Sequence, residues 1–387
     1  MPVEKKEKKW YTYSNIAQVK TLAKFSGGEA RLKATQADIA LLERLYQGKN
    51  AYHGEMHDHS KSGWKSDGKE LFIDWKNEIM PEKAIDFATI VDNKQSMHMR
   101  LPEWDDTMFI GGTEAGTVIL SDKLEKGSMH YNMIFDDPEK QDQLVSEFAE
   151  YKFSGGDKGT FVYPRFEPDR FRKVVKRIRE LGGFFVHVHP KYRSYMHSKD
   201  PEGYLFGEKT GLEVMTGHGG NMTRKENMDA YRLWVDLINL GHVVYATSGS
   251  DSHRRSTTCS LATVYSEKRS AHTYLEYFRE GNITAGPVGI RIAVGDTCTG
   301  GTTDFAGKRL VVSVGDFHCQ ERKPDHQYRV DVYNEKGLVF SQAFDNSKTA
   351  YFAINADNCR YYRANVYDVT EGYLFAIGNP VWNSNFK

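Results

Sequence analysis

The sequence has no excess of either charge, and this absence narrows its possible partners. Its 387 residues contain 52 Lys and Arg and 52 Asp and Glu, so the formal net charge is zero. A balanced chain has no broad positive field to attract a nucleic-acid backbone or an anionic membrane surface. We therefore expect neither a nucleic-acid polymer nor a membrane as a partner, and any recognition of phosphate must come from a few local cations.

Cysteines and long apolar runs are also scarce. The four cysteines are scattered, without a CxxC pair or the density of a disulfide scaffold, so they indicate neither a thiolate zinc site nor an oxidising compartment. No apolar run approaches the roughly 20 residues of a membrane span, and no apolar segment follows the lysine-rich start. A reduced cytoplasm is the predicted compartment, with secretion left open for a chain whose signal peptide has been trimmed.

Three stretches differ in their pattern of apolar residues. Residues 1–50 carry apolar side chains at helical spacings up to Gly48, which predicts a helical N-terminal extension. Residues 51–285 alternate short apolar runs with helical segments, which is typical of βα units. Beyond Gly286, residues 286–387 form short alternating stretches separated by turns, which predicts an antiparallel β-sandwich. The expected fold class is α/β with an appended β domain.

Two helix–strand units place polar clusters at the ends of strands. One predicted helix begins near Pro168 and ends at Gly182, and the strand Phe184–Val188 follows it. A second predicted helix ends at Gly241, before the strand His242–Thr247. In α/β barrels, catalytic groups lie at the carboxyl ends of strands, so the residues after these two strands are candidates for chemistry.

Histidines gather in the middle of the chain. Eleven of the fourteen lie between positions 53 and 253. His57 and His59 are two apart, so on a strand both rings point to the same face and can bind one ion, although a lone pair of this kind is weak evidence. Two further clusters follow apolar strands, namely His187 with His189 and Asp251 with His253. Three such clusters together predict a metal site.

Carboxylates follow two other apolar runs. Asp92 and Asn93 come directly after Phe87–Val91, and Glu114 follows Met108–Ile110. A donor set of histidine and carboxylate without cysteine suits Zn, Mn or Fe better than a structural zinc. We therefore expect divalent metal ions as cofactors.

The order of these motifs resembles the PHP (polymerase and histidinol phosphatase) superfamily of metallohydrolases, over about residues 53–253. Ser66-Asp67-Gly68, Gly286-Pro287 and Asn379-Pro380-Val381-Trp382 make the CehA/McbA-like branch the most similar one. The resemblance implies a distorted (β/α)7 barrel, here followed by the β-sandwich, with two or three metal ions at the carboxyl ends of its strands.

The resemblance also implies a set of ligands. One ion would be held by His57, His59, Glu114 and Asp251, and Glu114 would bridge to a second ion held by His130 and His189. Asp67 and His253 would hold part of a third site, where the family has a histidine in place of Asn93. The third position is left open: a weak site, an empty one, or one completed by His98, for which an exposed loop is the first expectation.

Other residues near the motifs are given supporting roles. Asp92, Asn93 and Glu213 are expected to orient ligands and not to bind metal. His253 and His187 are the candidate proton carriers, with packing as the alternative for His187. Phosphate oxygens would be clamped by cations, and the candidates are Lys191, Arg193, Arg254 and Arg255, each with plain surface charge as an equal alternative.

These observations predict a metal-dependent hydrolase acting on a phosphate ester of a small molecule or nucleotide. Two ions about 3.5 to 4 Å apart can lower the pKa of a shared water toward about 7 and stabilise a leaving oxygen. Two alternatives stay open: a carboxylic or carbamic ester hydrolase using the same site, and a degenerate metal-binding module that only recognises a ligand. The sequence does not decide whether the chain forms a homo-oligomer.

Overall fold

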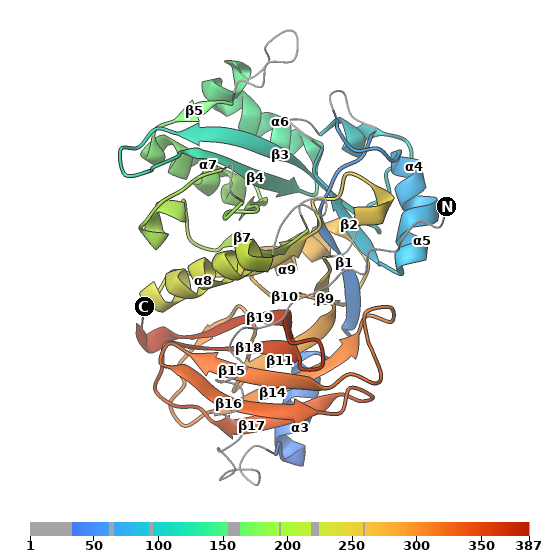
Figure 1. Cartoon of the computed structure of the whole chain (residues 1–387), viewed down its shortest axis with the longest axis vertical. Helices are drawn as coiled ribbons and strands as arrows, with labels where there is room; N and C mark the ends of the chain where they lie inside the picture. The colour runs from blue at the N-terminus through green and yellow to red at the C-terminus, as the bar shows by residue number, and fades with distance from the viewer. Residues whose placement is uncertain are drawn as a thin grey trace, which may run out of the picture.

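The computed structural model describes residues 33–61, 66–92, 96–153, 163–192, 195–217, 224–257 and 260–386. They form a mixed α/β fold with one large mixed sheet and a separate four-stranded antiparallel sheet (Figure 1). No helix in these ranges is both long enough and apolar enough to cross a membrane. The helical extension expected over residues 1–50 falls within the described residues only from position 33, so its first part lies outside them.

The elements before residue 286 alternate between strands and helices. The strands are β1 (Asn50–Asp58), β2 (Phe87–Ile90), β3 (Phe109–Ile119), β4 (Ser128–Phe135), β5 (Arg165–Phe166), β6 (Phe184–His187), β7 (Thr210–Thr216), β8 (Val244–Gly249), β9 (Ala262–Ser266) and β10 (Ile283–Ala285). The longer helices are α3 (Gln36–Leu45), α6 (Pro138–Glu147), α7 (Pro168–Glu180), α8 (Arg224–Leu240) and α9 (Ala271–Arg279). The short helices are α4 (Phe72–Asp74), η1 (Trp75–Ile79), α5 (Met80–Lys83), η2 (Met97–Arg100), η3 (Ala149–Phe153), η4 (Pro201–Tyr204) and η6 (Arg255–Thr257).

Within the large sheet, the strands follow the order β1-β2-β3-β4-β6-β7-β8. The two ends of this stretch meet, because Asp58 at the end of β1 bridges in parallel to Ser252 just after β8. The backbone N–H of His59 also donates to the carbonyl of Ser252, at 2.9 Å. The stretch therefore curves back on itself, and the ends of distant strands converge there. A closed barrel of seven strands stays a prediction.

The uniform βα repeat expected for residues 51–285 is interrupted at β4. This strand runs antiparallel to both β3 and β6, whereas β1-β2-β3 and β6-β7-β8 are parallel. The reason is the connection of residues 120–127, which is too short for the crossover that parallel strands need but sufficient for a hairpin. Glu114 consequently lies in the middle of the long strand β3 and not just after a strand end.

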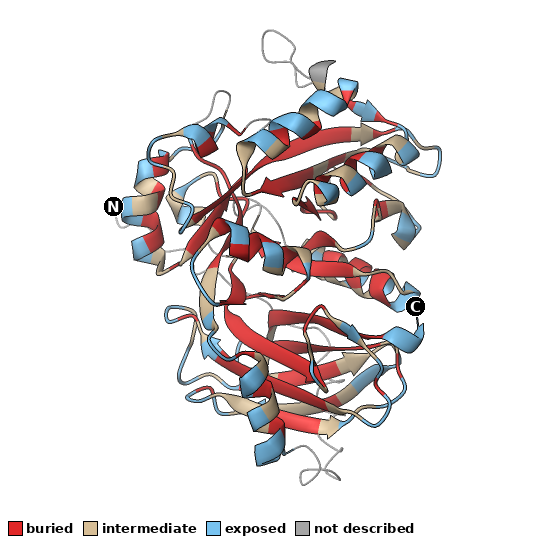
Figure 2. Ribbon diagram, turned by 180° about the vertical axis from the view of Figure 1, so that it is seen from behind, coloured by how far each residue is buried: buried red, intermediate tan, exposed pale blue. Residues whose placement is uncertain are grey.

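The two predicted helices form close to the expected positions. Helix α7 begins at Pro168 and buries the stripe that includes Phe171 and Val174, and it ends at Glu180, two residues before Gly182, whose φ is +84°. Helix α8 ends before Gly241, whose φ is +102°. Glycine adopts this left-handed backbone without a steric cost, so it ends helices well. The outer faces of the helices are exposed, while strands such as β2, β6 and β8 are buried throughout (Figure 2).

The rest of the chain forms the antiparallel β structure expected after residue 286. Its strands are β11 (Val288–Val294), β12 (Thr297–Cys298), β13 (Thr302–Thr303), β14 (Arg309–Phe317), β15 (Tyr328–Asn334), β16 (Gly337–Phe344), β17 (Ala350–Asn355), β18 (Tyr361–Asp368) and β19 (Tyr373–Asn383), with η7 (Ser384–Phe386) after them. One layer of the sandwich is the sheet β12-β11-β14-β17. The other layer is β16-β15-β18-β19, which is one end of the large sheet. Ile292 and Val312 from the first and Val330 and Val366 from the second share one buried core.

Two features connect the β-sandwich to the rest of the chain. Strand β19 pairs with β10, which pairs with β9, and β9 pairs with β1, so the large sheet runs through both parts. Helix α3 packs on the sandwich, where its Leu42 belongs to a buried hydrophobic cluster that also contains Val311 and Ala353. Figure 1 places α3 at the sandwich end of the molecule, away from β3 and β4.

Candidate metal centre

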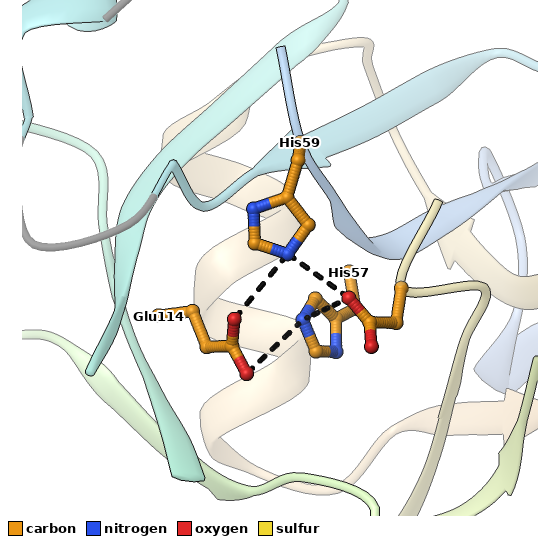
Figure 3. Close-up of side chains that lie close together, drawn as sticks. His57, His59 and Glu114 are labelled. Carbon is orange, nitrogen blue, oxygen red and sulfur yellow. Dashed lines mark hydrogen bonds and ion pairs between the residues drawn. The ribbon is translucent and has the colours of Figure 1, made fainter. Parts of the chain in front are cut away.

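Four predicted ligands from three strands meet at the place where β1 and β8 converge. His57 and His59 come from β1 and its end, Glu114 from β3, and Asp251 from the turn after β8. Nε2 of His59 lies 3.0 Å from Oδ1 of Asp251 and 3.4 Å from Oε2 of Glu114. His57, His59 and Glu114 point toward one another in Figure 3. All four side chains are buried, and one donor atom of each lies within 4.8 Å of the others, so they can hold one cation.

A second cluster shares Glu114 with the first. Oε1 of Glu114 lies 2.8 Å from Nδ1 of His130 on β4 and 3.2 Å from Nε2 of His189 after β6. The register explains the approach of His130, because Gly116, two residues after Glu114 on β3, lies directly opposite it on β4. Oε2 of Glu114 thus faces His59, whereas its Oε1 faces His130 and His189 and also lies 3.9 Å from Nε2 of His57, so this carboxylate contacts both clusters.

A third cluster shares His59 with the first. Nδ1 of His59 lies 3.8 Å from Oδ1 of Asp67, and Nε2 of His253 lies 3.1 Å from Oδ2 of Asp67. Unlike the other two clusters, this one is open to solvent, since about half of the Asp67 side chain and 30% of the His253 side chain are exposed. Asn93, whose place in the third site was in question, lies outside the described residues.

Two of the proposed ligands have a backbone conformation that side chains other than glycine rarely adopt. The φ angles are +31° for His189 and +48° for Asp251. Non-glycine residues held in this region cost of order 1–3 kcal/mol and tend to occur at functional sites. The strand ends are thus bent at the two positions where a ligand turns toward the clusters.

Glu213 on β7 contacts two of the predicted ligands, and its role in orienting them stays a prediction. Its Oε1 lies 3.1 Å from Nδ1 of His57, and its Oε2 accepts the backbone N–H of His189 at 2.8 Å. Since Nδ1 of His57 faces Glu213, its Nε2 is left for the clusters. That Nε2 is buried and has no hydrogen-bond partner among the described residues, which fits a nitrogen that donates its lone pair to a metal ion.

Asp92 lies under the end of β1. It accepts hydrogen bonds from the backbone N–H and hydroxyl of Ser60 at 2.6 and 2.7 Å, and from the hydroxyl of Ser66 at 3.0 Å. His98 lies 3.4 Å from Asp92 and is fully buried, so the expectation of an exposed loop histidine was wrong. His98 belongs to none of the three clusters. Asp92 therefore ties the residue directly after His59 to the segment that carries Asp67.

Charges in the centre are strongly coupled. Burial would lower the pKa of His57, but Asp251 and Glu213 outweigh it and raise this pKa to about 10. Burial would raise the pKa of Glu114, but His130 and His189 bring it well below its usual range. Glu114 thus stays ionised and draws positive charge into the centre. Buried carboxylates and inward-facing imidazoles of this kind suit divalent cations.

Two of the predicted phosphate-binding cations, Lys191 and Arg255, contact other residues. Lys191 donates to the hydroxyl of Tyr204 at 2.8 Å, and Arg255 pairs with Glu78 and Glu82. The carbonyl of Arg254 accepts from the hydroxyl of Ser252 at 2.7 Å, and Arg193 lies outside the described residues. Binding of phosphate by these four residues stays a prediction.

His187 lies outside the clusters. Its buried ring stacks on Tyr204, with 6.0 Å between the ring centroids, and burial lowers its pKa to about 3. Its role as a proton carrier stays a prediction. His253 is half-buried; burial would lower its pKa, but Asp67 and Asp251 raise it to about 9.

Sequence reasoning missed two contacts of the centre. The hydroxyl of Tyr163 lies 2.8 Å from Nε2 of His130, and the amide and hydroxyl of Ser250 donate to Glu55 at 3.0 and 2.6 Å. The glycine at position 116, opposite His130, was the available signal for the first, because a small residue there leaves room for a ring. The second joins residues 195 positions apart, and no local pattern signals it.

Comparison with known proteins gives a distant likeness. No family model matches the sequence, and no curated protein matches it. Among solved structures, the chain is similar to a two-domain protein from Bacteroides vulgatus described as containing a predicted PHP-like metal-dependent phosphoesterase. The identity is 14%, the TM-score is 0.40, and the match covers 86% of this chain and 96% of the other.

Proposed function

We propose that this chain is a metal-dependent hydrolase of the PHP type, which cleaves a phosphate ester of a small molecule or nucleotide. The observation that carries the proposal is the sharing of a carboxylate ligand: Glu114 belongs to two clusters. Shared ligands place cations side by side, as hydrolysis by paired metals requires, whereas a structural metal needs one closed site. The curved stretch of sheet would then be the distorted barrel expected from the motifs.

The residues present would hold two or three divalent ions. His57, His59, Glu114 and Asp251 would hold one, Glu114, His130 and His189 another, and Asp67 and His253 part of a weaker third. When bound, such ions supply a water of lowered pKa and positive charge opposite the leaving oxygen.

The protein's own groups would orient the donors and move protons. Glu213 keeps Nε2 of His57 and the backbone of His189 in position. In the third cluster, only Asp67 is more exposed to solvent than His253. Nε2 of His253 contacts the Asp67 carboxylate. We assign His253 as the group that returns a proton to the leaving oxygen or passes one to solvent.

A second candidate is hydrolysis of a carboxylic or carbamic ester, as in the branch that the motifs resemble most. The observation that favours it is that two candidate cations have partners within the protein. Lys191 is hydrogen-bonded to Tyr204, and Arg255 forms ion pairs with Glu78 and Glu82. A neutral carbonyl substrate would need no cation beyond the metal ions, whereas a phosphate would gain from one.

Chelator-treated protein reloaded with Mn²⁺, Zn²⁺ or Fe²⁺ provides the test. We expect phosphate release from a panel of phosphomonoesters and phosphodiesters, with aryl carboxylates and carbamates assayed in parallel. His189→Gln should abolish turnover, while His242→Gln, at a surface histidine bonded to Glu202 and Glu208, should leave it unchanged. Turnover of the carbonyl esters alone would establish the second candidate, and tight metal binding without any turnover would leave a recognition module.

A further inference from the structure

Hydrogen bonds from β3 hold the backbone next to Tyr163 in place. Its neighbour Pro164 offers a backbone carbonyl that accepts from the backbone N–H of Val118 at 2.9 Å and from the buried hydroxyl of Thr117 at 2.8 Å. Strand β5 then continues in parallel beside the end of β3. These bonds fix the backbone next to Tyr163 relative to the strand that carries Glu114.

A glycine makes room for the tyrosine ring. A side chain at Gly116 would overlap the ring of Tyr163, because its first carbon would meet three ring atoms. Gly116 lies opposite His130 in the register of β3 and β4, so the space left by the missing side chain is the space next to His130. The ring of Tyr163 stands edge-on to that of His130, with 5.5 Å between centroids. The hydroxyl thereby reaches Nε2 of His130 at 2.8 Å.

The two nitrogens of His130 face different partners. Nδ1 lies 2.8 Å from Glu114, within the second cluster, and Nε2 faces Tyr163. A neutral imidazole has one N–H, and a nitrogen that binds a metal ion must be the one without it. If Nε2 donates its hydrogen to the oxygen of Tyr163, then Nδ1 presents its lone pair to the cluster.

We propose that Tyr163 is a positioning residue that selects the ring nitrogen with which His130 binds the second metal ion. This inference rests on the proposed metal centre and extends it to a residue outside the three clusters. Carboxylates and backbone carbonyls usually serve this role for ligand histidines, and their loss typically costs about 10- to 100-fold in metal affinity or activity. A phenol is a neutral acceptor, so it fixes the orientation of His130 without adding negative charge beside Glu114.

The decisive experiment is a titration of chelator-treated protein with Co²⁺, followed by visible absorption and chelator competition. The wild type should bind two strong equivalents, the first at the four-ligand cluster. In Tyr163→Phe, which keeps the ring and removes the hydroxyl, the first equivalent should be unchanged and the second about 10- to 100-fold weaker. His130→Ala calibrates the complete loss of the second equivalent.

Tyr151→Phe is the matched control, because the contacts of its hydroxyl within the described part of the chain are the hydroxyl of Tyr131, at 2.6 Å, and the sulfur of Met133, and neither residue belongs to the clusters. ¹⁵N NMR of the Zn²⁺-loaded wild type should show a protonated Nε2 on His130, with this preference lost in Tyr163→Phe. Wild-type affinity for both equivalents in Tyr163→Phe would overturn the inference, as would uptake of only one equivalent by the wild type. Two equivalents without ester cleavage would defeat the proposed function and leave this inference standing.

Discussion

Glu213 contacts two of the predicted ligands, and a single-atom change can therefore test whether it orients them. Its two oxygens accept from Nδ1 of His57 and from the backbone N–H of His189. In Glu213→Gln, one of these oxygens becomes an NH₂ group that faces a donor. We expect metal affinity to fall by about 10- to 100-fold with little loss of fold stability. Glu147→Gln, at an exposed pair with Arg177, should bind metal like the wild type in isothermal titration; equal affinities of all three proteins would contradict the assignment.

Close packing at Gly249 gives a second prediction at this scale. A Cβ at this position would lie 2.5 Å from Cβ of His57, which is attached to the backbone, and 2.7 Å from Oε1 of Glu213, which is held by its contact to Nδ1 of His57. Gly249→Ala should therefore destabilise the protein by about 1–3 kcal/mol and displace His57. Gly207→Ala, whose Cβ would meet only the end of Val175 at 3.0 Å, should be milder in urea unfolding. A wild-type midpoint and metal content for Gly249→Ala would refute this account.

The residues of the clusters were predictable to different degrees. His57, His59 and Asp251 follow from spacing, because alternation along a strand and position after a strand end are local properties. His130 and Tyr163 are brought together by the register of β3 with β4 and by the hydrogen bond from Thr117 to Pro164. Both features depend on pairing between distant segments. Local pattern therefore found most donors, while the groups that orient them needed the structure.

Among the elements, the sequence pattern predicts the positions of helices more reliably than the directions of strands. Apolar periodicity and a terminal glycine fix α7 and α8 locally. The direction of β4 depends on the length of the connection before it, and the docking of α3 on the sandwich depends on partners more than 200 residues away, such as Arg309 for Asp38. Periodicity carries no information about either.

The docking of α3 should weaken in acid. Arg309 donates two hydrogen bonds to Asp38, at 3.1 and 2.8 Å, and lowers the pKa of this carboxyl from 3.8 to about 2. A depressed carboxyl pKa contributes stability that is complete above the unfolded value and is lost as pH falls through the folded value. We expect Asp38→Asn to cost about 1 kcal/mol at pH 7 after allowance for the partly exposed Arg309.

The difference between Asp38→Asn and the wild type should shrink between about pH 4 and pH 2. Chemical denaturation at several pH values measures it, and Asp169→Asn, whose carboxylate is exposed beside Arg172, should show little effect at any pH. A cost that stayed constant down to pH 2 would mean that ionisation of Asp38 has no part in holding α3.

At the scale of the whole molecule, the sandwich and the metal-binding part are joined through a buried asparagine. Asn379 on β19 accepts the backbone N–H of Ala246 at 2.7 Å and donates to the carbonyls of Ala246 and Ile283 at 3.0 and 3.1 Å. Ala246 lies on β8, five residues before Asp251. The fully buried amide thus connects the last strand of the chain to the strand that delivers a proposed ligand.

Removal of this amide should affect both parts together. Asn379→Ala leaves three backbone groups without their partner, at roughly 1 kcal/mol or more for each, so we expect a loss of about 2–4 kcal/mol. Asn385→Ala, which loses only an exposed hydrogen bond to Asp304, is the control near the same terminus.

Because the large sheet runs from β1 through β9 and β10 to β19, calorimetry should show a single unfolding transition, and its temperature should be lower in Asn379→Ala. Added Zn²⁺ should raise that whole transition by mass action, since a ligand that binds only the native state stabilises everything that unfolds with its site. Two transitions, of which Zn²⁺ moves one and Asn379→Ala the other, would show instead that the sandwich and the metal centre are energetically independent.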